Sequence, residues 1–148
     1  MPYKTFAAGN VLTAADMNAV TADPSTADVA TAQGTTSTTY TDLTTSGPAV
    51  TLTMVSGQKA LVTVSAQMSH SAGGGAAAAM AFAVSGATTL AATDANRATS
   101  SSTSEITTSK STVFTATASG SHTFTAKYRA VSSGTGTFTD RRIVVKPF

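Results

Sequence analysis

The stretch from Lys59 to Gly86, KALVTVSAQMSHSAGGGAAAAMAFAVSG, holds two runs of alternating side chains around a glycine segment. Every second residue from Val62 to Met68 is apolar, and the residues between them are polar. From Met80 to Val84, large apolar residues alternate with alanine. Because successive side chains of a strand point to opposite faces, both runs predict strands. Gly73–Gly75 permits a chain reversal, so we expect the two runs to form an antiparallel pair at the centre of an all-β domain.

The rest of the chain repeats this pattern of short alternating runs separated by turn residues. About eight strands at a spacing of roughly ten residues are typical of an antiparallel β-sandwich, here jelly-roll-like. The polar segment Thr93–Ser104 is expected to be a loop at one end of the fold. Besides the two runs above, the predicted strands are Thr38–Leu43, Ala49–Val55, Thr88–Ala91, Ile106–Ala118, His122–Val131 and Phe138–Val145, with a first short strand at Val29–Gln33.

The composition predicts a thin hydrophobic core. The chain has 148 residues, which suits one domain, and roughly half of them are Thr, Ala or Ser. There is no Trp, and large apolar side chains are scarce. Burial between subunits would compensate for this scarcity, so we expect a homo-oligomer, with a homotrimer as the working hypothesis.

The charge balance argues against several classes of partner. A net charge of +2 is too small to indicate nucleic-acid binding, and no apolar run is long enough to span a membrane. The chain has no Cys, which excludes disulfides and thiolate metal sites. No segment combines a charged n-region with an apolar h-region, so no signal peptide is expected.

Residues 1–34 differ from the body and are interpreted as a docking arm followed by a linker, with the β-sandwich domain at 35–148. Thr13 is a good N-cap, and Asp16 places an acid in the first turn of a short helix predicted from Ala14 to about Val20. Such a helix is too short to be stable alone and must dock on a partner surface. The candidate docking residues are Tyr3, Phe6, Val11, Leu12 and Met17.

No catalytic or metal site is predicted. His70 and His122 are the only histidines; a third ligand such as Asp94 or Glu105 would be needed for a metal, and no close ligand pair is visible. The chain has no G-x-S-x-G elbow, and Gly73–Gly75 lacks the spacing of a phosphate-binding loop. We therefore expect neither a cofactor nor a catalytic residue.

The densest group of charges is Asp140-Arg141-Arg142 in the last predicted strand. Alternation places the two arginines on opposite faces. The simpler interpretation is an edge strand protected by charge. The alternative is that Arg141 and Arg142 contact an acidic group of another subunit.

The arm, YKTFAAGNVLTAADMN, resembles the opening of many small structural proteins of tailed phages, especially those that infect actinobacteria. Those proteins often begin with an aromatic–x–x–G–x–VLTAADxN stretch, matched here by Phe6, Gly9, Val11–Asp16 and Asn18. The body is similar to a β domain found in the same proteins. The matching stretches are TTYTDL (38–43), GPAVT (47–51), ALVTV (60–64), FAVSGATT (82–89) and TFTAKYR (123–129).

The resemblance implies a virion protein assembled in the host cytoplasm, and it extends to minor tail proteins, fibres and capsid-surface proteins alike. In many of these a longer middle section separates arm from body, whereas here the two are joined directly. We therefore expect a non-enzymatic capsid decoration protein whose arm docks on the major capsid protein or another virion protein. The alternative is a minor tail or tail-fibre protein that binds a host glycan through the loops around Gly73–Gly75 and Thr93–Ser104; a small hydrolase is a third possibility.

Overall fold

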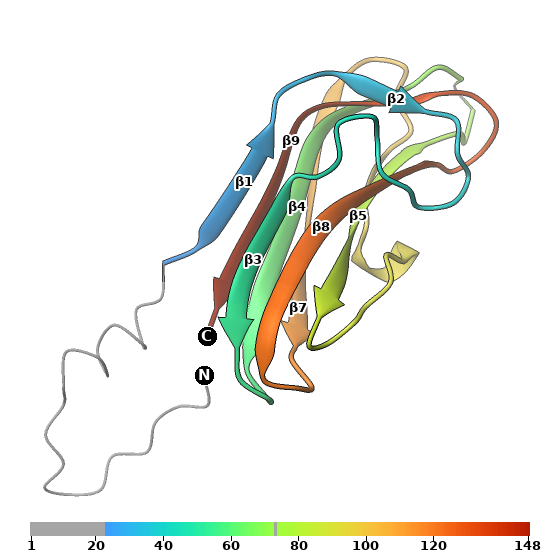
Figure 1. Ribbon diagram of the computed structural model, residues 1–148. Helices are drawn as coiled ribbons and strands as arrows, with labels where there is room; N and C mark the ends of the chain where they lie inside the picture. Colours follow the sequence, from blue (N-terminus) through green and yellow to red (C-terminus); the bar gives the residue numbers. More distant parts are fainter. Residues whose placement is uncertain (1–22, 73) are drawn as a thin grey trace, which may run out of the picture.

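Two antiparallel sheets pack face to face in the computed structural model, which describes residues 23–72 and 74–148 (Figure 1). One sheet, called here the first sheet, has the order β1-β9-β4-β7, with β2 also paired to β9; the second sheet has the order β3-β8-β5-β6. The predicted antiparallel β-sandwich is confirmed. The elements are β1 Ser25–Val29, β2 Gln33–Thr35, β3 Ala49–Met54, β4 Lys59–His70, β5 Ala78–Gly86, the 3₁₀ turn η1 Asp94–Asn96, β6 Ala98–Ser100, β7 Ile106–Thr115, β8 Gly120–Ala130 and β9 Gly136–Pro147.

The connections between strands give the jelly-roll character. From β3 onward every connection crosses to the opposite sheet, except the one between β5 and β6, which pair with each other. The five-stranded first sheet and the four-stranded second sheet are thus joined in the manner of a jelly roll. The crossing connections mean that contacts between layers join segments that are distant in sequence.

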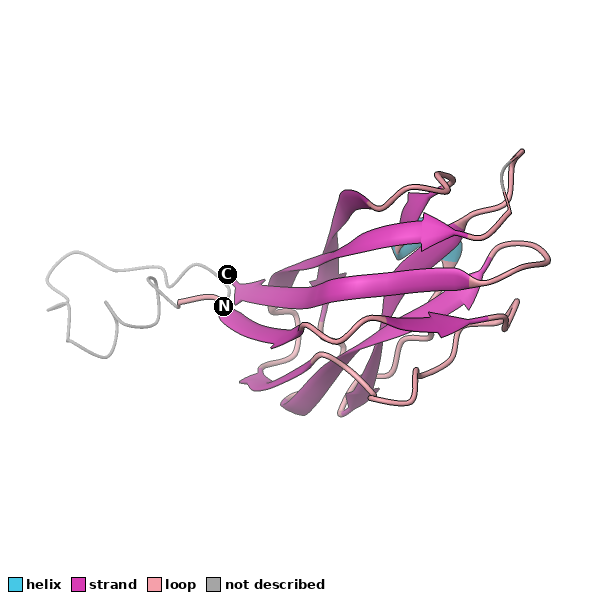
Figure 2. Cartoon of the chain, turned by 90° about the horizontal axis from the view of Figure 1, so that it is seen from above, coloured by secondary structure: helices cyan, strands magenta, loops and turns pink. Residues whose placement is uncertain are grey.

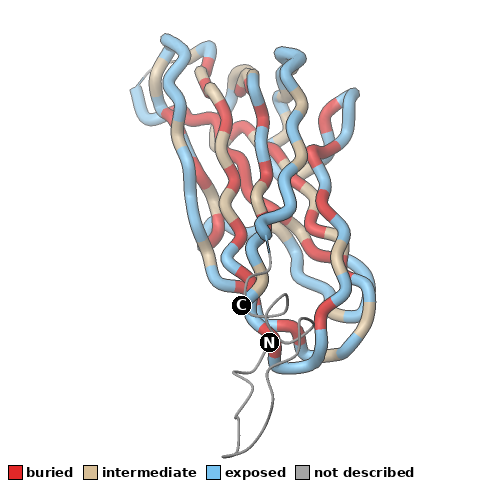
Figure 3. Tube along the Cα trace, turned by 90° about the vertical axis from the view of Figure 1, so that its left-hand side faces the viewer, coloured by how far each residue is buried: buried red, intermediate tan, exposed pale blue. Residues whose placement is uncertain are grey.

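The core lies between the two sheets and follows the period of two. Buried and exposed positions alternate along most strands (Figure 3), most regularly along β4 and β8. Aromatic rings fill the centre: Phe114 packs edge-on against Phe124 with ring centroids 5.1 Å apart, and Tyr128 packs against Phe138 at 4.8 Å. Such pairs contribute about 0.5–1.5 kcal/mol beyond the area they bury, which helps a core in which alanine is common.

The two alternating runs around Gly73–Gly75 do not form a hairpin. β4 lies in the first sheet between β9 and β7, whereas β5 lies in the second sheet between β8 and β6. The expected central pair is therefore wrong, although both strands are present. Alternation identifies the buried face of each strand, but it does not identify the neighbour. Here β4 ends at His70 in one sheet and β5 begins at Ala78 in the other.

β5 is buried on both faces, which its alternation with alanine did not predict. Ala79 and Ala81 point away from the core yet have no exposed surface. They lie opposite Arg129 and Lys127 of β8, whose longer side chains cover them. At the end of β5, Gly86 has a φ of +104°, and a Cβ there would collide with the carbonyl oxygen of Ser121. Glycine is therefore required at this point of closest approach.

Three further segments differ from the sequence-based expectation. The segment 38–43 forms only a single bridge, Thr41 to Tyr128, because β3 already occupies the neighbouring part of the β8 edge. The segment 88–91 likewise forms one bridge, Val84 to Leu90. The expected loop at 93–104 contains η1 and the short strand β6, which extends the second sheet.

The first sheet begins earlier in the chain than the expected boundary at residue 35. β1 pairs along its whole length with β9, from Ser25 opposite Val145 to Val29 opposite Arg141, and β2 continues beside β9. Residues expected to be a linker therefore form strands of the sandwich. The short strand expected at Val29–Gln33 is wrong, because residues 30–32 connect β1 to β2. The start of β1 and the C-terminus lie at the same end of the sandwich (Figure 2), and the loop residues 74–77 and 131–135 lie at the other.

Candidate functional site

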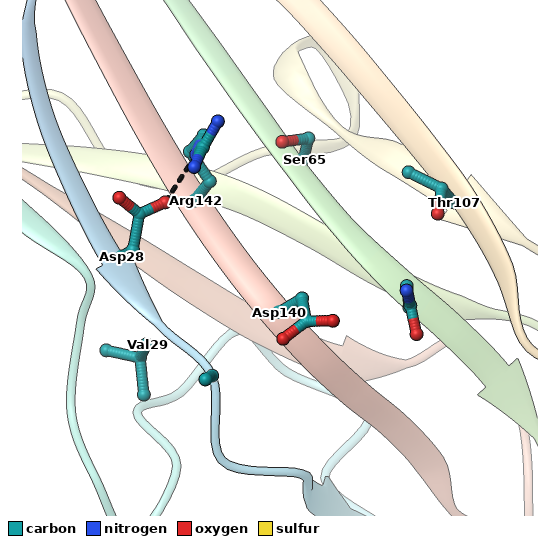
Figure 4. Close-up of a pocket in the computed structure, with 8 residues that line it drawn as sticks. Asp28, Val29, Ser65, Thr107, Asp140 and Arg142 are labelled. Atoms are coloured by element: carbon teal, nitrogen blue, oxygen red, sulfur yellow. Dashed lines mark hydrogen bonds and ion pairs between the residues drawn. The ribbon is translucent and has the colours of Figure 1, made fainter.

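A groove of about 480 Å³ crosses the outer face of the first sheet, and we call it the bulge groove (Figure 4). All four main strands of that sheet contribute to it. The side chains are carboxylate, guanidinium, amide and hydroxyl groups, with two small apolar residues at the β1 edge. The lining residues are Asp28, Val29, Ala30, Ser65, Gln67, Thr107, Asp140 and Arg142.

A β-bulge in β9 shapes this groove. Ser65 of β4 lies opposite Arg142, but Gln67 lies opposite Thr139, so one extra residue of β9 is accommodated between them. Asp140 has a φ of +48°, a left-handed conformation that aspartate tolerates better than most residues. The bulge leaves Asp140 exposed on the outer face and turns Arg141 into the core.

The charges of the bulge groove are partly paired. Arg142 donates from Nε to Asp28 of β1, and both side chains remain about half exposed. The hydrogen bond to Asp28, followed by its charge, raises the pKa of Arg142. Within the described part of the chain, Asp140 makes no side-chain hydrogen bond. The groove can therefore offer hydroxyl, amide and carboxylate groups to a polar partner, but no nucleophile paired with a base lines it.

Arg141 lies in the interior and has no exposed surface. Its guanidinium donates to the carbonyl oxygens of Thr45 at 3.1 Å, Thr31 at 3.3 Å and Gly47 at 3.4 Å, and it stands 5.4 Å from the ring centre of Tyr128. The Tyr128 hydroxyl donates to the same Gly47 oxygen at 2.8 Å. Arg141 thus holds two connections, 30–32 and 44–48, against the core. Arg141 is enclosed by its own chain and cannot reach another subunit. A subunit contact through the exposed Arg142 stays a prediction.

The edge-strand interpretation of Asp140-Arg141-Arg142 is wrong. β9 has β4 on one side and β1 with β2 on the other, so both of its edges are paired. The alternation correctly placed the two arginines on opposite faces. It did not reveal the bulge, and without the structure nothing identified β1 as the second neighbour.

A second group of charges, the Asp94 cluster, lies on the outer face of the second sheet and consists of Tyr40, Asp94, Arg97 and Arg129. Arg129 donates to both carboxylate oxygens of Asp94, at 2.9 and 2.7 Å, and Arg97 lies 2.8 Å from the second of them. The Tyr40 hydroxyl donates to Asp94 at 2.9 Å, and the Arg129 guanidinium stands 5.2 Å from the Tyr40 ring centre. The cluster therefore ties the segments 37–42 and 91–97 to β8.

The surroundings shift two pKa values in the Asp94 cluster. Burial, with the hydrogen bond and charge of Asp94, raises the pKa of Tyr40 to about 12, although Arg129 opposes the shift. Partial burial acts to raise the pKa of Asp94, but the Tyr40 hydroxyl and the two arginines outweigh it and lower that pKa. These groups satisfy one another, which indicates a structural ion network rather than a site with a free general acid or base.

The two histidines are both buried and lie at opposite ends of the sandwich. His70, at the end of β4, accepts a hydrogen bond at Nδ1 from the Ala72 backbone N–H at 3.1 Å. His122, near the start of β8, has its Nδ1 2.9 Å from the Gly120 carbonyl oxygen and packs edge-on against Phe114. Among residues 23–72 and 74–148, no three metal-ligating side chains of the His, Cys, Asp or Glu type come together.

The predicted docking residues Tyr3, Phe6, Val11, Leu12 and Met17, and the predicted helix, lie outside the described residues. Sequence reasoning singled out Asp140 and Arg142 but missed Asp28, the partner of Arg142, and Gln67, which lines the same groove. It also missed the Asp94 cluster. The signal that could have found it is the alternation of β8, which places Lys127 and Arg129 outward beside an otherwise uncharged strand β5.

Comparisons with known proteins give no relative for this chain. No protein-family model matches it, and no curated protein is significantly similar to it. In the part of the chain that the structure describes, no helix is both long enough and apolar enough to cross a membrane.

Proposed function

We propose that this chain is a non-enzymatic structural protein of a phage virion, and specifically a capsid decoration protein that docks through residues 1–22. The observation that carries the proposal is the two-ended organisation of the sandwich. The described chain begins at Asp23, and Ser25 pairs with Val145, so residues 1–22 join the body at the end where the C-terminus lies. A segment docked on a shell would then leave the opposite end, with its loops, projecting outward.

The described residues support a binding role more than a chemical one. The bulge groove, and a second groove lined by Tyr40, Asp94 and Arg129 of the Asp94 cluster, hold ion pairs and hydroxyl groups. The two buried histidines line neither groove. A decoration protein that binds the assembled shell, but not its separate subunits, stabilises the shell by mass action. The apolar residues expected to make the contact are Leu12 and Met17, with Tyr3, Phe6 and Val11.

The proposal is tested by mixing the purified protein with phage heads that lack it, and separately with tails, followed by sedimentation. We expect saturable binding of the full chain to heads. A double variant, Leu12→Glu with Met17→Glu, should lose binding while keeping the circular dichroism and unfolding midpoint of the wild type. A variant of the bulge groove, Gln67→Ala, serves as the matched control and should bind heads normally.

Binding to tails or to host cell walls, and not to heads, would contradict the decoration role. It would favour the alternative, a minor tail or fibre protein that recognises a host glycan. Equal binding of the Leu12 and Met17 double variant and the wild type to heads would contradict docking through residues 1–22.

A further inference from the structure

Strand β7 forms one edge of the first sheet. Neither the fold of the described residues nor the proposed docking gives this edge a partner. β7 pairs with β4 over ten positions, from Thr115 opposite Lys59 to Ile106 opposite Met68, with no break in register. Among the described strands, none pairs with its other side; β6 and η1 contact β7 without adding a ladder. A long, regular edge of this kind is a template for another strand.

The direction of the free backbone groups follows from one hydrogen bond just beyond the strand. The N–H of Ala116 donates to the carbonyl oxygen of Gln58, so even-numbered residues of this segment face β4. Because backbone groups alternate in direction along an antiparallel strand, the N–H and C=O groups of odd-numbered residues face the open side. These residues are Thr107, Ser109, Ser111, Val113 and Thr115.

The other edges of the sandwich are short or interrupted. The opposite edge of the first sheet is divided between β1 and β2, which have five and three residues. In the second sheet, β6 has three residues, and β3 has six and is preceded by Pro48. β7, with ten residues, carries a single charge, Lys110. Short edges, proline and charge are the usual protections against pairing, and β7 has the least of them.

Exposed apolar side chains gather at this edge as well. Val113 and Ile106 of β7 are about half exposed, and Leu61 of β4 lies directly opposite Val113 on the outer face. Half of the large exposed apolar residues of the described chain thus lie on β7 or beside it. Pairing along β7 would cover backbone and part of this apolar surface together.

We propose that β7 is a self-association edge, at which two copies of this chain pair antiparallel, β7 to β7, around a two-fold axis. The position of Lys110 restricts the register. An axis through Lys110 would place the two ammonium groups directly opposite each other, which is unfavourable. Moving the axis by one residue to Ser111 places Lys110 opposite Thr112 and retains residues 107–115 in the ladder, with about ten hydrogen bonds between the chains.

A second copy is the occupant favoured by these observations, because the edge is complementary to itself. An antiparallel pair needs odd-numbered residues opposite odd-numbered residues, and the Ser111 register provides this along the whole overlap. It also supplies the intersubunit burial that the thin core led us to expect. The β7 contact does not involve residues 1–22. The experiments on β7 can therefore fail or succeed independently of the proposed docking.

Cysteine cross-linking tests the register directly, since the wild-type chain contains no cysteine. In the Ser111 register, the two copies of residue 111 face each other with Cα atoms about 5.5 Å apart, within the range that a disulfide spans. Ser111→Cys should therefore form a covalent dimer rapidly on mild oxidation. Ser121→Cys, at an exposed position at the start of β8 in the other sheet, is the matched control and should remain monomeric on a non-reducing gel.

Proline substitution tests the edge without disturbing the fold. In Ser109→Pro, the lost N–H faces the open side, so the ladder with β4 and the unfolding midpoint should be retained. The dissociation constant of the dimer, measured by sedimentation equilibrium, should rise about tenfold or more, because each copy loses a bond at the interface. A monomer at all concentrations, a trimer insensitive to Ser109→Pro, or association lost only on deleting residues 1–22 would each overturn the proposal.

Discussion

Arg141 is the largest side chain that the described part of the chain buries completely, and it has no carboxylate partner there. Three carbonyl oxygens accept its protons instead, and one of them also accepts the Tyr128 hydroxyl. A buried guanidinium is costly unless it is hydrogen-bonded. The two terminal nitrogens of Arg141 meet this need through Thr31, Thr45 and Gly47, whereas its Nε has no partner among the described residues. The Arg141 guanidinium therefore holds the connections 30–32 and 44–48 in place and is not available to bind a ligand.

Arg141→Leu should lower the free energy of unfolding by about 2–4 kcal/mol, because the carbonyl oxygens of Thr31 and Thr45 lose their donor and that of Gly47 keeps only the Tyr128 hydroxyl. The neighbouring substitution Arg142→Leu removes one exposed ion pair and should have a much smaller effect, because solvent screens that pair. Urea unfolding of both variants measures the difference. Equal losses for the two arginines would contradict the buried role assigned to Arg141.

Asp94→Asn should make the stability less dependent on pH. The folded-state pKa of Asp94 is lowered, so its contribution is fully present above the ordinary aspartate pKa and is lost as pH falls through the lowered value. At pH 7 the variant should have a Tm about 2–4 °C below the wild type, the size expected for about 1 kcal/mol. Thermal unfolding from pH 7 to pH 2 should show the two Tm values converging. A constant difference over that range would contradict the linkage.

At the scale of elements, β9 shows how one inserted residue changes which side chains of a strand face the core and which face outward. The inserted Asp140 separates an inward-facing Phe138 from an inward-facing Arg141 by two outer-face residues instead of one. The same insertion places Asp140 and Arg142 in the bulge groove. A regular strand would pair continuously with β4 and would lack this local change of direction.

Substitution at Asp140 tests the strain at the bulge. Asp140→Val should lower the free energy of unfolding by about 1–2 kcal/mol, because a β-branched residue is disfavoured at a φ of +48°. Thr137→Val, in the same strand and with negative φ, should change the stability by less than about 0.5 kcal/mol. Denaturant midpoints of both variants provide the measurement. An Asp140→Val variant as stable as the wild type would show that the bulge adapts without cost.

Individual strands could be predicted from the sequence, but their partners could not. Alternation located β3, β4, β5, β8 and β9 to within a few residues because apolar side chains recur at every second position over much of each strand. It failed for 38–43, where threonine suits a strand but β3 already occupies most of that edge. The pairing of β4 with β7 and β9 depends on crossings between layers, which leave no local signal.

At the scale of the whole molecule, the candidate sites were harder to predict than the fold. The bulge groove and the Asp94 cluster both join residues more than thirty positions apart, Asp28 with Arg142 and Asp94 with Arg129. The charges themselves were visible in the sequence, and Asp140 with Arg142 was singled out. Their partners follow from sheet order, which the alternation does not determine.

The pairing of β1 with β9 also determines how the body would respond to mechanical load. If residues 1–22 are held by a large particle, tension enters at Asp23 and runs along the axis of β1. Ladder hydrogen bonds lie across the strand direction, so such a pull shears the five register pairs together instead of opening them one by one. A protein attached through this segment would therefore resist hydrodynamic drag and collision, and tension applied between Asp23 and the adjacent C-terminus would separate the same two strands at much lower force.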